Sequence, residues 1–74
     1  MARIPDGLTD SVLSEVKNVG SLSYTQQLRD FTRYSNENGL QFNLYVRPAT
    51  TLSGPLEDAI NNDLIKLNYI PGAR

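Results

Sequence analysis

The sequence contains no cysteine, no histidine and no tryptophan among its 74 residues. Without thiols and imidazoles the protein cannot form disulfide bonds, Cys/His zinc sites, thiol nucleophiles or a Ser-His-Asp triad. No apolar run approaches the roughly 20 residues that a membrane-spanning helix requires. A formal net charge of −1 argues against binding of nucleic acid through an overall positive charge. Any chemistry must therefore come from carboxylates, lysine, arginine, hydroxyls and amides, together with a hard cation.

The composition is that of a small globular domain, with 39% hydrophobic and 20% charged residues. A chain of this length forms one domain at most, so we expect residues 1–74 to be a single unit. Met1-Ala2 leads directly into a strand-like segment. From this abrupt start we expect the chain to be a fragment of a longer protein.

Apolar periodicity and turn residues predict the element order β-β-α-β-α-β. The expected strands cover residues 3–8, 12–19, 40–47 and 64–70, and the expected helices cover residues 24–36 and about 54–61. Ser23 and Gln26 have the spacing of a capping box for the first helix, and Ser53 or Gly54 caps the second. A turn is expected at Gly20-Ser21 and a loop at 50–54. The closing strand-helix-strand order favours parallel pairing, which predicts an α/β fold with a small mixed sheet.

The two N-terminal strands read as a hairpin, because Asp10-Ser11 between them has turn chemistry. A two-residue turn there places Gly7 opposite Ser14. In the same register Asp6 lies opposite Glu15, and their side chains would point to one face about 5 Å apart. Two opposed carboxylates repel each other unless a cation lies between them.

A divalent metal is the expected occupant of this face. Mg²⁺ prefers oxygen ligands and commonly uses one or two carboxylates together with substrate phosphate. We expect Asp6, Glu15 and the backbone carbonyl of Val16 to be its protein ligands. Lys17, two residues after Glu15 on the same face, would lie beside a metal-bound water. There it would position or deprotonate the water, or stabilise the charge that develops on a phosphate.

These residues resemble a known motif. Pro5-Asp6 followed by Glu15-Val16-Lys17 looks like the PD-(D/E)xK motif of the restriction-endonuclease-like nuclease superfamily. Gln27 with Phe31 is similar to the auxiliary Gln-x-x-x-Tyr element of its RecB-like branch, with phenylalanine in place of tyrosine. Over residues 3–71, segments such as RIPDGLTD, SEVKNV and SYTQQLRDF resemble C-terminal restriction-endonuclease-fold toxin domains of bacterial polymorphic toxins.

The resemblance implies a nuclease that hydrolyses phosphodiester bonds with Mg²⁺ or Mn²⁺, DNA being the favoured substrate. It implies catalytic roles for Asp6, Glu15, Lys17 and Gln27. It also implies secretion or delivery from the producing bacterium, action in the cytoplasm of the target cell, and a cognate immunity protein. The superfamily core usually begins with a helix before the first strand, and we expect that helix to be absent here.

Less specific interpretations remain open for several of these residues. Glu15 and Lys17 could form a solvated strand face, and a partly exposed Lys17 is expected to contribute no more than about half a kcal/mol to stability. Arg29 and Arg33 could bind substrate phosphate, although Arg33 could equally pair with acids on its own helix. Tyr24 is expected in or near the core.

Two other functions are open beside the toxin. A catalytically silent interaction module could retain the nuclease fold, and a DNA-repair or junction-resolving nuclease could share it. Cleavage assays separate the first of these from a nuclease.

Overall fold

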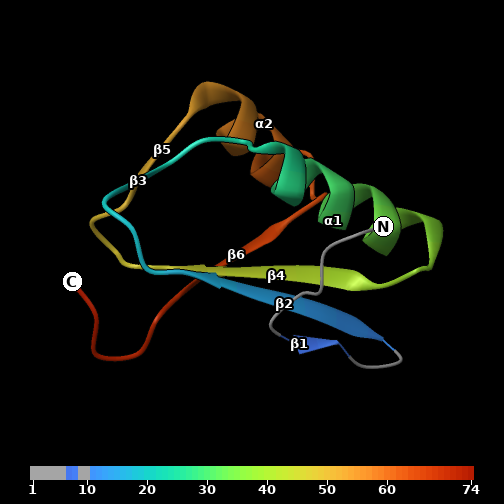
Figure 1. The fold of residues 1–74 in the computed structure, drawn as a ribbon, viewed down its shortest axis with the longest axis horizontal. Coiled ribbons are helices and arrows are strands. Elements are labelled where there is room, and N and C mark those ends of the chain that lie inside the picture. The colour runs from blue at the N-terminus through green and yellow to red at the C-terminus, as the bar shows by residue number, and fades with distance from the viewer. Residues whose placement is uncertain (1–6, 9–10) are drawn as a thin grey trace.

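The computed structural model describes residues 7–8 and 11–74, and they form one mixed α/β unit (Figure 1). Its elements are β1 (Gly7–Leu8), β2 (Val12–Lys17), β3 (Ser21–Leu22), α1 (Gln26–Glu37), β4 (Gln41–Val46), β5 (Thr51–Leu52), α2 (Gly54–Asn61) and β6 (Lys66–Tyr69).

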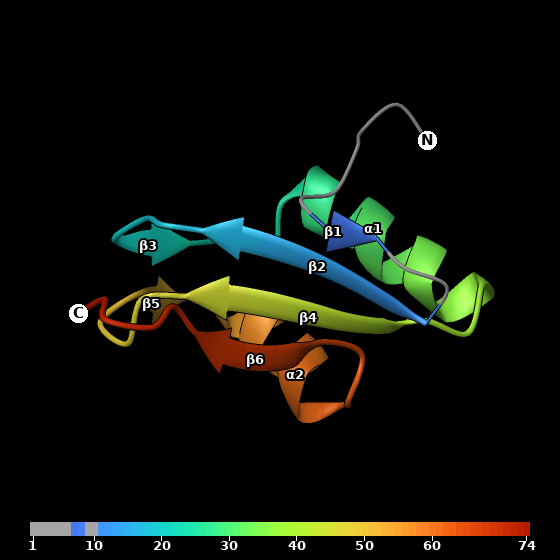
Figure 2. The same cartoon turned by 90° about the horizontal axis from the view of Figure 1, so that it is seen from below.

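The main sheet has the strand order β1-β2-β4-β6. β1 is antiparallel to β2, while β2, β4 and β6 run parallel to one another. Both helices lie on the same side of this sheet, and the view from the opposite side shows the strands in front (Figures 1 and 2). The described part of the chain is therefore a two-layer α/β structure whose sheet has one helix-covered face.

The core lies between the sheet and the two helices. Alternate residues of β2 and β4 point into it, as the period of two in the sequence requires. Phe31 of α1 and Phe42 of β4 meet edge to face, with ring centroids 6.2 Å apart. The buried apolar residues are Leu13, Leu22, Leu28, Phe31, Phe42, Leu44, Val46, Leu56, Ala59 and Ile65.

The expected strands and helices are present, with shorter strands and small shifts at their ends. The strand predicted for residues 12–19 ends at Lys17, and the strand predicted for 64–70 covers Lys66–Tyr69. The strand predicted for residues 3–8 is described only at Gly7–Leu8, and the expected absence of a preceding helix concerns residues outside the described ones. No helix of the described residues has the length and apolar character needed to cross a membrane.

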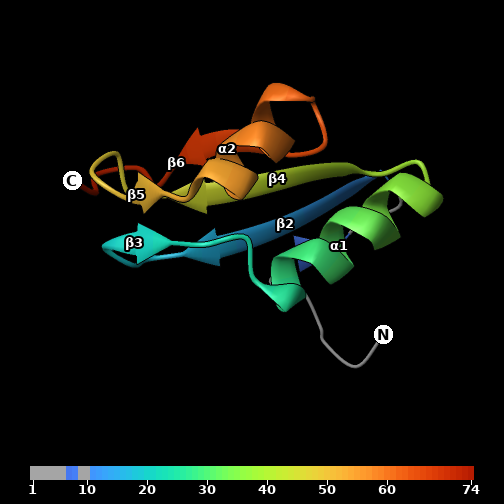
Figure 3. The same ribbon diagram turned by 90° about the horizontal axis from the view of Figure 1, so that it is seen from above.

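Two short strands contradict the predicted turn and loop. Ser21 pairs with Thr51, and Leu22 with Leu52, as a parallel two-stranded ribbon that leads into α1 and α2 (Figure 3). Strands of two residues have no periodicity that a sequence could reveal. Leu22 is buried, so the ribbon joins the starts of the two helices to the core.

The capping box predicted for α1 is wrong. Thr25 caps the helix, and its side-chain oxygen accepts a hydrogen bond from the Leu28 backbone N–H at 3.3 Å. The helix therefore begins at Gln26 and not at Tyr24. Its predicted end at Asn38-Gly39 is confirmed, because Gly39 has a φ of 67°, the left-handed conformation that glycine adopts readily.

The end of α2 has the same geometry without a glycine. Asp63 has a φ of 62°, and the next N–H, of Leu64, bonds to the Ala59 carbonyl at 3.0 Å. We expect Asp63→Gly to raise the free energy of unfolding by about 0.5–1 kcal/mol and Tm by several degrees. Asp63→Ala should lower both, since alanine tolerates positive φ less well than aspartate. Thermal melts check this, and destabilisation by glycine would contradict it.

Candidate functional site

A buried carboxylate marks the centre of β2. Glu15 is 3% exposed and points to the helix-covered face, between Leu13 and Lys17 along the strand. Its neighbour across the β2–β4 ladder is the fully buried Leu44. Burial of a charge among apolar residues is unfavourable unless a partner compensates it. A glutamate in this position therefore needs a specific reason beyond packing.

Lys17 supplies one compensating charge. Its Nζ lies 3.1 Å from Glu15 Oε2. The same ammonium donates a hydrogen bond to Gln27 Oε1 at 2.5 Å, across the gap between β2 and α1. Gln27 is in the first turn of α1, where the Thr25 cap sets the start of the helix. The structure thus brings together Glu15, Lys17 and Gln27, three of the four predicted catalytic residues.

The fourth, Asp6, lies outside the described residues, and so does its predicted pairing with Glu15. The hairpin register behind that prediction is confirmed where it is described, with Gly7 opposite Ser14 and Leu8 opposite Leu13. Val16 is 46% exposed, and its backbone lies beside Tyr45 in the β2–β4 ladder.

Two of the three predicted metal ligands, Glu15 and Val16, lie within the described residues. The described residues contain no group of three or more acidic side chains that could hold an ion without help. The Glu15 carboxylate and the Val16 carbonyl are nevertheless the hard oxygen donors that Mg²⁺ prefers, and Mg²⁺ usually completes its shell with water and substrate phosphate. This donor set fits a hard divalent cation and does not fit a soft one.

Lys17 is held in a way that suits catalysis. Its side chain is 24% exposed, and its ammonium contacts both Glu15 and Gln27. A fixed cation at such a position stabilises negative charge that develops on a bound phosphate, and it costs no reorganisation during the reaction.

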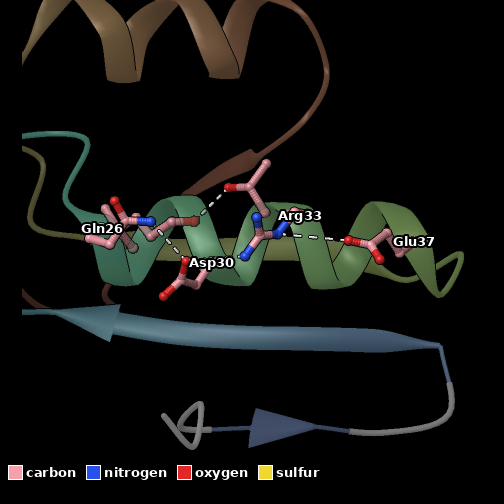
Figure 4. Close-up of polar contacts among 6 residues, drawn as sticks. Gln26, Asp30, Arg33 and Glu37 are labelled. Atoms are coloured by element: carbon pink, nitrogen blue, oxygen red, sulfur yellow. Dashed lines mark hydrogen bonds and ion pairs between the residues drawn. The ribbon is translucent and has the colours of Figure 1, made fainter. Parts of the chain in front are cut away.

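The two arginines predicted to bind substrate have different surroundings. Arg33 lies between Asp30 and Glu37 on the outer surface of α1: its guanidinium nitrogens are 3.6 Å from Asp30 Oδ1 and 3.7 Å from Glu37 Oε1 (Figure 4). The side-chain amide of Gln26 also donates a hydrogen bond to Asp30. Arg29 instead turns back over Tyr24 at the start of the helix. The sequence predicts for Tyr24 a place in or near the core, and the five-residue spacing of this pair has no periodic signal that would predict the stacking.

Residues 1–56 match the family model described as restriction endonuclease fold toxin 7. The chain belongs to this family. No curated protein and no solved structure matches the chain significantly.

Membership of the restriction endonuclease fold toxin 7 family confirms the resemblance inferred from the sequence and indicates a nuclease toxin. The match covers the strands and helix that carry Glu15, Lys17 and Gln27, and it ends within α2. The part of the chain that the structure describes from 57 onward, including β6, contributes none of the predicted site residues.

Proposed function

We propose that this restriction endonuclease fold toxin hydrolyses phosphodiester bonds of DNA with Mg²⁺ or Mn²⁺. The observation that carries the proposal is the contact of buried Glu15 with Lys17, together with the hydrogen bond from Lys17 to Gln27. A carboxylate and a lysine two residues apart on a strand, with a glutamine from the adjacent helix, match the functional groups that the sequence resemblance implies.

Each residue has a distinct role in this proposal. Asp6, Glu15 and the Val16 carbonyl hold the cation, which supplies Lewis-acid activation of a water and of the phosphate. Lys17 orients the attacking water or stabilises the charge on the phosphate oxygens. Gln27 accepts a hydrogen bond from Lys17 and so keeps the ammonium directed at the site.

The proposed biological setting rests on the resemblance to toxin domains and not on the geometry. We propose delivery from the producing bacterium into the cytoplasm of a neighbouring cell, where DNA is the target, and protection of the producer by a cognate immunity protein. A role as a toxin is supported by the family to which the chain belongs.

Plasmid cleavage tests the activity. Supercoiled DNA incubated with the protein and Mg²⁺ or Mn²⁺ is expected to be nicked or linearised, and a chelator should abolish this. An RNA substrate in parallel examines the preference for DNA. Binding of DNA without cleavage under every metal condition would favour the silent interaction module instead.

We also expect the metal to stabilise the fold. A cation that binds only the native state at ten times its Kd adds about 1.4 kcal/mol, which raises Tm by roughly 6–11 °C for a domain of this size. Thermal melts with Mg²⁺, Mn²⁺ and a matched ionic strength of Na⁺ measure the shift. Asp6→Ala and Glu15→Ala should lose it, and a shift of equal size in these variants would place the metal elsewhere.

A further inference from the structure

Two arginines four residues apart on α1 differ in how their charge is compensated. The guanidinium of Arg33 lies near two carboxylates, those of Asp30 and Glu37 (Figure 4). Arg29 forms no ion pair with a carboxylate among residues 7–8 and 11–74, and its closest ring contact is with Tyr24. Arg33 is therefore locally neutralised, while Arg29 retains its charge for a ligand.

Arg29 is also held in one orientation. Its Nε donates to the Tyr24 backbone carbonyl at 3.0 Å, and its guanidinium carbon lies 4.3 Å from the centroid of the Tyr24 ring. Stacking on an aromatic face stabilises a cation, most strongly for arginine because its group is planar. Neither contact uses the two terminal amino groups. Arg29 is exposed, and these two groups are the paired donors that match a phosphate.

The position of this pair relates it to the candidate active site. Tyr24 precedes Gln27 by three residues, so their Cα atoms are no more than about 11 Å apart. Gln27 in turn contacts Lys17. Tyr24 itself packs against the core, which fixes the location of its ring. The Arg29 guanidinium therefore lies near the N-terminal end of α1, the end whose Gln27 contacts Lys17, although Gln27 and Arg29 project from different faces of the helix.

We propose that Arg29 binds a backbone phosphate of the bound nucleic acid other than the one cleaved, and that Tyr24 is its positioning residue. A nucleic-acid strand carries a phosphate at every nucleotide, so a strand held at Lys17 presents a second phosphate nearby. This inference rests on the proposed function, because it takes its ligand to be the substrate of that site.

Binding of a short DNA duplex by the full chain in chelator, measured over a range of salt concentrations, tests the inference without cleavage. Arg29→Gln should weaken binding about tenfold and reduce the slope of log K against log salt by about 0.9, the loss of one phosphate contact. The matched variant Arg33→Gln should change the affinity less than about twofold, because its charge is already compensated.

The role of Tyr24 has its own readout. Tyr24→Phe keeps the aromatic face and should bind like the unmodified chain. Tyr24→Leu and Arg29→Lys should weaken binding by about three- to fivefold and leave the salt slope unchanged, because the charge is kept and only its orientation is lost. Thermal melts establish that each variant is folded at the temperature of the assay.

The outcomes separate this inference from the proposed function. Equal losses for Arg29→Gln and Arg33→Gln would show an effect of total charge and overturn the inference. DNA cleavage by the unmodified chain together with unchanged affinity in Arg29→Gln would overturn it and leave the nuclease intact. If polyglutamate binds the chain through Arg29 and does not reduce the binding of DNA, the site belongs to an acidic protein and the inference is overturned. A chain that neither binds nor cleaves nucleic acid would overturn both.

Discussion

Lys17→Ala is expected to lower the rate of DNA cleavage at saturating metal by about 10²- to 10³-fold, the usual loss when a group that stabilises the transition-state charge is removed. The affinity for Mg²⁺ should not fall, because an ammonium is not a metal ligand. Both quantities are measurable with one preparation, by single-turnover cleavage and by metal titration.

A second lysine provides the matched control. Lys66 is exposed in β6, outside the Glu15–Lys17–Gln27 cluster, so Lys66→Ala should cleave at the rate of the unmodified chain. Gln27→Leu should fall between the two variants, since it removes the hydrogen bond that orients Lys17 and keeps the charge. Unchanged cleavage in Lys17→Ala would contradict the mechanistic role of this residue even though the family assignment would stand.

Local sequence patterns were sufficient to place most of this cluster. The alternation of Leu13, Glu15 and Lys17 predicts that the three share one strand face, and they do. The turn arithmetic at Asp10-Ser11 predicted the register that Gly7 and Leu8 adopt. Periodicity over several residues predicts strand face and register, because every further residue that fits the alternation makes the opposite assignment of faces less favourable.

Features determined by tertiary context were not predictable. Thr25, and not Ser23, caps α1, since both residue types serve as caps and only packing selects between them. The stacking of Arg29 on Tyr24 depends on how the chain enters α1. The nearly complete burial of Glu15 could not be predicted either, because alternation assigns a side chain to a face of the strand and does not say how completely a helix covers that face.

That burial changes the expected stability of Lys17→Ala. From the sequence alone, the expected loss of stability is within about half a kcal/mol, as for a surface lysine. The structure places the lysine 3.1 Å from a carboxylate that is almost fully buried. Loss of a cation beside a buried charge costs much more than loss of an exposed ion pair. Because Lys17 itself is partly exposed, we expect about 2 kcal/mol, or roughly 10 °C in Tm.

The asymmetry of the pair makes this stability prediction specific. Glu15→Gln should cost less than Lys17→Ala, because the remaining Lys17 reaches water while a remaining Glu15 does not. The double variant should be at least as stable as Lys17→Ala alone, which corresponds to a coupling energy of about 1–2 kcal/mol between the two residues. Melting curves of the four proteins without metal provide the cycle, and additive effects would contradict the coupling.

The effect of Mg²⁺ on the Tm of these variants tests whether the cation binds at Glu15. A divalent cation bound at Glu15 replaces part of the positive charge that Lys17→Ala removes. We therefore expect Mg²⁺ to raise the Tm of Lys17→Ala by more than it raises that of the unmodified chain, and to leave Glu15→Gln nearly unchanged. Na⁺ at the same ionic strength is the control for screening. Equal shifts in all three proteins would show that the cation does not bind at Glu15, and the metal-dependent mechanism would then lose its central ligand.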